Sequence, residues 1–328
     1  MVGTVLGPID AEDLRGTLVH EHLYFSFPGD HFDPSDVWER GSELDKIAER
    51  LREVKEHGIH TIVDPCPVEC GRDPRLMAEA SRASGVNVVC ATGFYVEDIG
   101  IPFYWRNRSV DEIASFYLFE IENGIAGTGI SPGVIKAASG DPPTDLEKRF
   151  LAAAAIASER SGLPIITHCE NSKGWDVQQE IFAKHGVDAG RCLIGHQDQA
   201  DTAQQLISIA RDGSFAGIDR VGYELLSPIE KRVELASAVR EAGLIDHLCL
   251  SQDRICSLRS ARFPYAVPDH LRDGFAQLEP WISEQMTGRP LSYIFTEFWP
   301  LLEKEGFTAE DRVTIFEKNP ARLLSGDK

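Results

Sequence analysis

Eight short apolar runs recur along the chain, and segments of helical periodicity separate them. The runs lie at about 17–22, 60–65, 87–93, 132–137, 164–169, 191–196, 215–220 and 247–253. Between the first two runs, Leu44, Ile47, Leu51 and Val54 follow one another at the spacing of a single helix face. Eight strands that alternate with helices predict a parallel sheet, and eight is also the number of strands that closes a barrel.

Polar side chains that can bind metals stand at or near the ends of five of these runs. They are His20 and His22, Lys136, His168, His196 and Asp253. An open doubly wound sheet would gather such groups from two or three strands, whereas a barrel brings all eight carboxyl ends into one ring. We therefore predict an α/β fold, a (β/α)8 TIM barrel, with residues 1–328 as a single domain.

Pairs that resemble capping boxes indicate where the helices begin. They are Ser42 with Asp45, Ser109 with Glu112, Thr144 with Glu147, and Thr308 with Glu310 and Asp311. A serine or threonine hydroxyl at such a position satisfies a free backbone N–H, and the acid complements the helix dipole.

The balance of charge restricts the partners of this chain. Its 328 residues include 33 Lys and Arg against 52 Asp and Glu, so the formal net charge is −19. This excess argues against nucleic acid and anionic membranes as partners. The absence of a long apolar run argues against a membrane span. Seven cysteines, an odd number, and a start that lacks the pattern of a signal peptide predict reduced thiols and a cytoplasmic location.

The histidines are informative as a set. His20 and His22 are two positions apart on one strand, so both imidazoles face the same side and Glu21 faces the other. A single histidine at a strand end, such as His168 or His196, is more often a core residue bonded to a backbone carbonyl. Four of them at strand ends predict a metal site.

Lys136 is the unusual member of the set, because it ends an apolar run and its ammonium group would lie in the barrel mouth. A buried cation is costly unless it is neutralised. Pairing with a buried acid such as Asp253 is one solution. Reaction of the neutral amine with carbon dioxide is the other, since the resulting carbamate has two oxygens that can bridge two metal ions. Asp253 itself can ligate a metal and accept a proton, or serve as a helix cap or ion-pair partner.

Taken together, these segments resemble the phosphotriesterase family of the amidohydrolase superfamily of (β/α)8 barrels. The resemblance extends over nearly the whole chain, as far as 315–321. The matching segments are His20-Glu-His22, 91–95, 133–136, 166–168, 194–196, 217–220 and 250–253.

The resemblance implies a centre of two divalent metal ions. The His-x-His pair and Asp253 would bind the more buried ion, and His168 and His196 the more exposed one. Lys136, carboxylated by carbon dioxide, would bridge both ions together with a hydroxide. Such ligands suit zinc first, and also manganese, cobalt or iron.

The expected reaction is hydrolysis of a small-molecule lactone or ester by the metal-bridging hydroxide, with promiscuous phosphotriesterase activity. Two cations lower the pKa of a shared water and polarise the substrate oxygen, and Asp253 would pass the proton to the leaving group. Phosphoester or amide hydrolysis is the alternative within the family. A metal-binding barrel that acts as a non-catalytic sensor is the alternative from another class. The resemblance also implies a homodimer.

Two further residues are candidates for catalysis. Tyr95 follows the third run, where a tyrosine resembles the lactonase branch of the family, and its phenol could donate a hydrogen bond to a lactone oxygen. The alternative is a tyrosine that packs over the barrel mouth. Arg220 matches the Asp-Arg pair of the family and either contacts the substrate or pairs with an acidic neighbour.

The stretch 254–290 follows the eighth run and is longer than the corresponding loop of family lactonases. We expect a long loop here that acts as a specificity lid and includes a helix or two. It contains Arg254, Arg259 and Arg262, which could hold a carboxylate or phosphate of a bulkier or anionic substrate. Ion pairing at the surface is the alternative for these arginines.

Overall fold

A computed structural model describes residues 1–259 and 268–326. Its centre is a sheet of eight strands in which each strand pairs in parallel with the next one along the chain. The strands are β3 (Gly16–Leu18), β5 (Ile59–Asp64), β6 (Asn87–Gly93), β7 (Val134–Ser139), β8 (Ile165–Cys169), β9 (Cys192–Ile194), β10 (Phe215–Ile218) and β11 (Leu248–Leu250). This arrangement confirms the predicted (β/α)8 barrel.

The first and last strands meet where the polar residues lie. The first apolar run is interrupted after Leu18 and resumes as β4 (His22–Ser26), which pairs in parallel with β12 (Ile255–Arg259). Between the two pairs of strands, the Asp253 amide donates to the His20 carbonyl (2.9 Å), and the His22 amide donates to the Arg254 carbonyl (2.8 Å). The seam of the barrel is therefore joined through the backbone of the predicted site.

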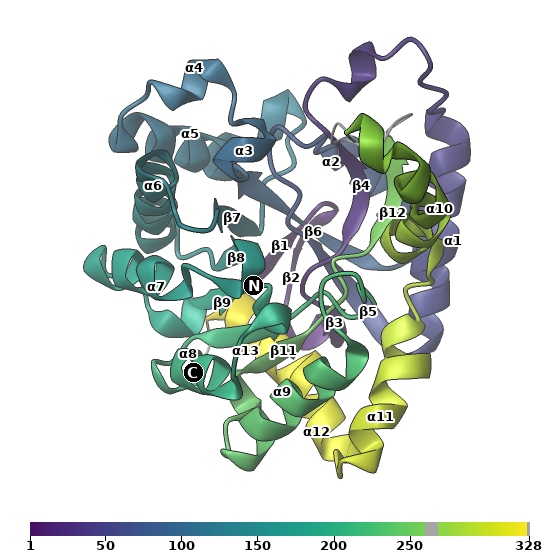
Figure 1. Ribbon diagram of the computed structural model, residues 1–328. Coiled ribbons are helices and arrows are strands. Elements are labelled where there is room, and N and C mark those ends of the chain that lie inside the picture. Colours follow the sequence, from purple (N-terminus) through teal and green to yellow (C-terminus); the bar gives the residue numbers. More distant parts are fainter. Residues whose placement is uncertain (260–267, 327–328) are drawn as a thin grey trace.

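Helices surround the strands in a ring (Figure 1). The helices between consecutive strands are α1 (Arg40–Glu56), α2 (Pro74–Ser84), α3 (Glu97–Gly100), α4 (Phe103–Arg106), α5 (Val110–Asn123), α6 (Asp145–Ser161), α7 (Trp175–Lys184), α8 (Ala203–Arg211) and α9 (Ile229–Glu241). Those after the last barrel strand are α10 (Arg272–Ser283), α11 (Trp299–Lys304), α12 (Ala309–Val313) and α13 (Asn319–Ser325). A hairpin of β1 (Val2–Thr4) and β2 (Gly7–Ile9) precedes the barrel.

Below the rim, the barrel interior is apolar. Side chains from successive strands, such as Val63, Val89, Ile166 and Leu193, form one buried cluster, and Leu323 of α13 belongs to it. Alternating strand residues produce this layering, because every second side chain faces inward. The packed interior leaves the carboxyl-end rim as the place where polar groups gather.

Most of the predicted helix starts are observed. Ser109, Thr144 and Thr308 each form a capping box with the acid three residues later. The expected cap at Ser42 is wrong. The N-cap of helix α1 lies three residues earlier, at Glu39, whose carboxylate accepts hydrogen bonds from the Gly41 and Ser42 amides, so the helix begins at Arg40.

The segment after β11 is more regular than the expected long loop. Its described part comprises strand β12, a 3-10 turn (Asp269–Leu271), helix α10 and a π-helical turn (Glu284–Gly288). The π-helical turn that follows α10 contacts β12, and α10, β12 and β4 contribute side chains to one cavity (Figure 1). Arg262 lies outside the described residues, so the structure does not place this candidate.

Two expectations from composition have structural counterparts. All seven cysteines are buried and free of disulfides. Among the described residues, none of the helices combines the length and apolar character that crossing a bilayer requires.

A buried ion pair joins helix α9 to the loops above β9 and β10. The Arg232 guanidinium is fully buried and donates from Nε to Asp198 Oδ1 (2.6 Å). Asp198 also accepts from the backbone amides of Asp219 and Arg220 (3.2 Å each). The pair therefore fixes the segment that follows β10.

We expect Arg232→Met to lower the free energy of unfolding by about 3–5 kcal/mol, because it leaves the Asp198 carboxylate buried without its cation. Urea denaturation followed by circular dichroism measures the change. Lys231→Met is the matched control, since Lys231 pairs with the exposed Glu234 and should cost no more than about 1 kcal/mol. Equal stability of the two variants would contradict the role of the buried pair.

Candidate metal centre and active site

His20, His22 and Asp253 converge at the rim of the barrel. Asp253 Oδ1 lies 3.2 Å from His22 Nε2 and 3.7 Å from His20 Nε2. Possible ligand atoms of the three residues all lie within 4.8 Å of one another. The two imidazoles face one point, as the His-x-His spacing predicted, and Glu21 faces away toward the backbone amides of Gln252 and Arg254.

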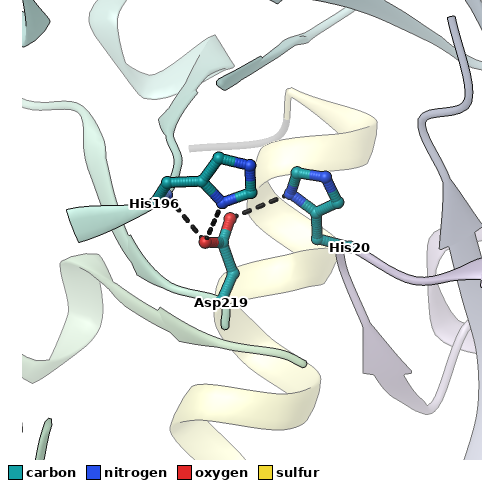
Figure 2. Close-up of side chains that lie close together, drawn as sticks. All are labelled: His20, His196 and Asp219. Carbon is teal, nitrogen blue, oxygen red and sulfur yellow. Dashed lines mark hydrogen bonds and ion pairs between the residues drawn. The ribbon is translucent and has the colours of Figure 1, made fainter. Parts of the chain in front are cut away.

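A fully buried carboxylate, Asp219, orients two of the imidazoles (Figure 2). Its Oδ2 lies 2.9 Å from His20 Nδ1, and its Oδ1 lies 2.7 Å from both the Nδ1 and the backbone N of His196. Asp64 does the same for His22, with 3.1 Å between Oδ1 and Nδ1. A proton held on each Nδ1 by an acid leaves the Nε2 lone pair free for a metal.

The roles of Asp219 and Asp64 were not predicted from the sequence. Both follow the pattern that identified the other site residues, since Asp64 ends β5 and Asp219 comes directly after β10. Asp219 also lies inside a segment that resembled the family. Asp219 follows the seventh barrel strand and His20 follows the first, so the contact between them could not be assigned before the barrel closes.

Two site residues have strained backbones. His196 and Asp253 adopt positive φ angles of 58° and 52°, a conformation that residues other than glycine seldom take. Such strain persists only where surrounding contacts enforce it, and it concentrates at functional sites.

His168 presents its other ring nitrogen to the site. Its Nε2 lies 2.8 Å from Glu170 Oε2, while its Nδ1 lies 3.2 Å from the Tyr95 hydroxyl and 3.5 Å from Arg220 Nη2. Burial lowers the pKa of His168 to about 4, so the ring is neutral near pH 7 and can act as a ligand. Because Glu170 occupies Nε2, the Nδ1 atom of His168 is the one that is free to bind a metal ion.

Lys136 is buried at the same place, with Nζ 3.2 Å from His20 Nε2. Burial lowers the pKa of Lys136 to about 8, although Asp253 and Asp219 oppose this shift. The acid that was considered as its partner, Asp253, forms its ion pair with Arg220, with 3.1 Å between Oδ2 and Nε. Burial alone would raise the pKa of Asp253, but the neighbouring histidines and Arg220 hold it well below its ordinary value.

The site opens into a cavity of about 220 Å³, with the predicted site residues as its polar floor and mostly apolar walls to which Tyr223 and Gln285 add polar groups. The floor comprises the six predicted metal-binding residues with Tyr95 and Arg220. The walls come from the first, third and seventh barrel loops and from α10 and the turn after it. They include Phe25, Phe27, Ile99, Leu225, Leu226, Ile282 and Met286.

The described arginines of the 254–290 stretch do not line this cavity. Arg254 is fully buried and stacks at 5.2 Å on the ring of Tyr223. Arg259 pairs with Asp36 at 2.6 Å and lies over Trp38. For Arg259, the structure shows the alternative of ion pairing.

A parallel barrel with imidazoles, a lysine and a carboxylate on its carboxyl-end rim places the chain in the class of (β/α)8 barrel enzymes. The sequence model of the phosphotriesterase family matches residues 1–324, and the chain belongs to this family. It is therefore a hydrolase, and its family implies metal ions. The donor set fits that requirement, since His20, His22 and Asp253 present ligand atoms to one point.

Similar proteins extend over nearly the whole chain. An aryldialkylphosphatase of Saccharolobus solfataricus is 34% identical, with 97% of each chain covered. A phosphotriesterase homology protein of Escherichia coli is 30% identical and covers 94% of this chain and 97% of its own. The solved structure of an organophosphorus hydrolase from Deinococcus radiodurans is 33% identical, with a TM-score of 0.88, and covers 98% of this chain and 96% of its own.

We expect Asp219→Asn to weaken zinc binding by roughly 10- to 100-fold, because the amide cannot hold the protons on both Nδ1 atoms. Competition with a chromophoric chelator measures the affinity. Asp212→Asn, at an exposed position on the amino-terminal side of β10, is the control and should bind zinc as the wild type does. Unchanged affinity in Asp219→Asn would show that the carboxylate does not act through the imidazoles.

Proposed function

We propose that the chain is a binuclear metal-dependent hydrolase of lactones or carboxylic esters, with phosphotriesters as secondary substrates. The observation that carries this proposal is the convergence of four imidazoles, Lys136 and Asp253 on the floor of one cavity. These groups come from five barrel strands or the residues that follow them, and each of the four imidazoles has an acid on the nitrogen opposite the one that faces the site.

The contacts support an assignment of ligands to two ions. His20, His22 and Asp253 would hold the more buried ion through two Nε2 atoms and a carboxylate oxygen. His168 and His196 would hold the second ion, and a carbamate on Lys136 would bridge both. When bound, two divalent ions supply a hydroxide near neutral pH and polarise the substrate's carbonyl or phosphoryl oxygen.

The chain's own residues then direct the proton and the substrate. Asp253 accepts the proton of the attacking water and carries it to the leaving group, and Arg220 at 3.1 Å keeps this carboxylate ionised beforehand. The Tyr95 hydroxyl, which is 3.2 Å from His168 Nδ1, is placed to donate to a substrate oxygen at the rim. A tyrosine donor at this point favours a lactone or ester carbonyl.

The cavity walls indicate the kind of side group that the substrate carries. Leu225, Leu226, Ile282 and Met286 present aliphatic or thioether groups above the polar floor. The described arginines of the 254–290 stretch do not line the cavity, and Arg220, which does, is paired with Asp253. We therefore favour a neutral lactone or ester with an apolar chain over an anionic one. Phosphotriesters remain the second candidate because one relative is named an aryldialkylphosphatase.

The proposal predicts about two zinc ions per chain and hydrolysis that depends on them. Zinc-reconstituted protein should open lactones with apolar side chains and hydrolyse aryl esters, and paraoxon more slowly. A strong chelator should abolish each activity, because the ions supply both nucleophile and electrophile. Elemental analysis and pH-stat assays provide the measurements.

Lys136→Ala tests whether Lys136 bridges the two metal ions or only lies near them. It should lose metal and on the order of 100-fold or more of the activity, with partial recovery in short carboxylic acids that replace the bridge. Lys148→Ala, at a surface lysine paired with Asp145, is the control. Metal binding without hydrolysis of any substrate would favour the sensor alternative, and fewer than one ion per chain would overturn the proposal.

We expect Ile282→Asp to reduce kcat/KM for long-chain lactones by roughly 10-fold or more, and for short-chain lactones much less, because a buried CH2 contributes about 0.8 kcal/mol. Leu278→Asp is the matched control, since Leu278 lies on the same helix but is 54% exposed. A series of lactones of increasing chain length measures the effect. The same dependence on chain length in Ile282→Asp and the wild type would exclude this wall from substrate binding.

A further inference from the structure

The backbone of Asp253 has a strained conformation, and hydrogen bonds hold both its amide and its carbonyl group. With φ at 52°, this residue lies in the left-handed region. Its amide donates to the His20 carbonyl (2.9 Å), and its carbonyl accepts from the hydroxyl of Tyr223 (2.8 Å). The second bond comes from a side chain, so it can be removed without changing the barrel seam.

The loop that carries Tyr223 is itself anchored. The Tyr223 carbonyl accepts from Nη2 of the buried Arg232 (2.9 Å), and the carbonyl of Gly222 accepts from Arg289 (2.6 Å). Arg232 is fixed in turn by Asp198 (2.6 Å). The phenol therefore reaches Asp253 from a backbone with little freedom to shift.

Arg254 lies on the ring of Tyr223 and outside the cavity. Its side chain is fully buried, with Cζ 5.2 Å from the ring centroid. Within the described residues, its Nε, Nη1 and Nη2 have no hydrogen-bond partner. A buried guanidinium without hydrogen bonds is costly, and the aromatic face compensates only part of that cost. A residue kept at such a cost is a candidate for a functional role.

We propose that Tyr223 and Arg254 are positioning residues for Asp253, in the hydrolysis proposed above, on which this inference rests. The hydroxyl of Tyr223 holds the Asp253 carbonyl so that the carboxylate points at the metal-binding imidazoles. The Arg254 cation under the ring polarises the phenol and strengthens the bond that it donates. Arg254 touches no substrate and acts through Tyr223.

Tyr223→Phe tests the first half of the proposal. It should lower kcat about 10-fold and leave KM within about twofold, because one hydrogen bond is lost while the ring remains. Tyr293→Phe is the matched control, since the Tyr293 hydroxyl donates to the exposed Glu224 and the residue does not line the cavity. A rise in KM with kcat unchanged would make Tyr223 a substrate contact only and would overturn the proposal.

Arg254→Met tests the second half. This variant removes a buried guanidinium that has no hydrogen-bond partner in the described chain, but the buried Glu21 carboxyl also loses a nearby cation, so the variant should stay folded with only a small change in its unfolding temperature. Its kcat should nevertheless fall about threefold, and the fall should vanish when Tyr223 is already leucine, since coupled residues are not additive. A full additional loss in the Tyr223→Leu background would show that Arg254 acts by another route.

Hydrogen exchange of the metal-free protein decides the inference independently of activity. The peptide 251–256 should exchange faster in Tyr223→Phe than in the wild type and in Tyr293→Phe, because the Asp253 backbone loses one of its restraints. If the zinc-loaded wild type hydrolyses nothing, the proposed function fails, and faster exchange still supports the positioning role. Equal exchange in all three proteins overturns the positioning role whatever the activity.

Discussion

The site depends on one buried carboxylate, Asp219. Its two oxygens bind the Nδ1 atoms of His20 and His196, which follow the carboxyl ends of the first and sixth barrel strands. An ionised acid without solvent is costly, and here two ring nitrogens and the His196 amide offset that cost. The same bonds leave the Nε2 atoms facing the cavity. Without this acid, each ring would be free to turn and the proposed metal centre would lose its geometry.

A series of buried polar contacts extends from this carboxylate through the neighbouring loops. Asp198 accepts from the amides of Asp219 and Arg220 and binds Arg232 of α9. Arg232 holds the carbonyl of Tyr223, whose hydroxyl holds the carbonyl of Asp253. Ion pairs buried in this way contribute little net stability to the fold, but removing one partner lowers the free energy of unfolding strongly, because the other charge stays buried and unpaired. The rim therefore owes its rigidity to polar groups, while the barrel below it owes its stability to apolar packing.

The contrast between floor and walls bears on the chemistry. The cavity combines the polar site residues with apolar side chains such as Leu225, Leu226 and Ile282. Wherever such apolar groups exclude water, electrostatic interactions are stronger than in solvent. Helix α10, in the stretch that was expected to contain a helix or two, contributes to these walls, while the substrate-binding role considered for the arginines of this stretch is not what the described ones show. Arg254 is buried behind Tyr223 instead, and Arg259 pairs with Asp36.

The sequence by itself determined the barrel and the positions of its rim residues. Both are local properties, since short apolar runs between helical segments predict buried parallel strands, and polar residues at the carboxyl ends of such strands lie on the same edge of the sheet. The roles of Asp219 and Asp64, the break after Leu18, the cap at Glu39 and the place of Arg254 were decided only by the tertiary structure. Each of these features depends on which groups from distant segments of the chain come into contact. Whether a side chain contacts solvent, substrate or a buried partner is decided only when the elements around it have packed. For that reason the class of reaction follows from the chain's pattern of residues, while the orientation of its imidazoles and the character of its cavity follow from the fold.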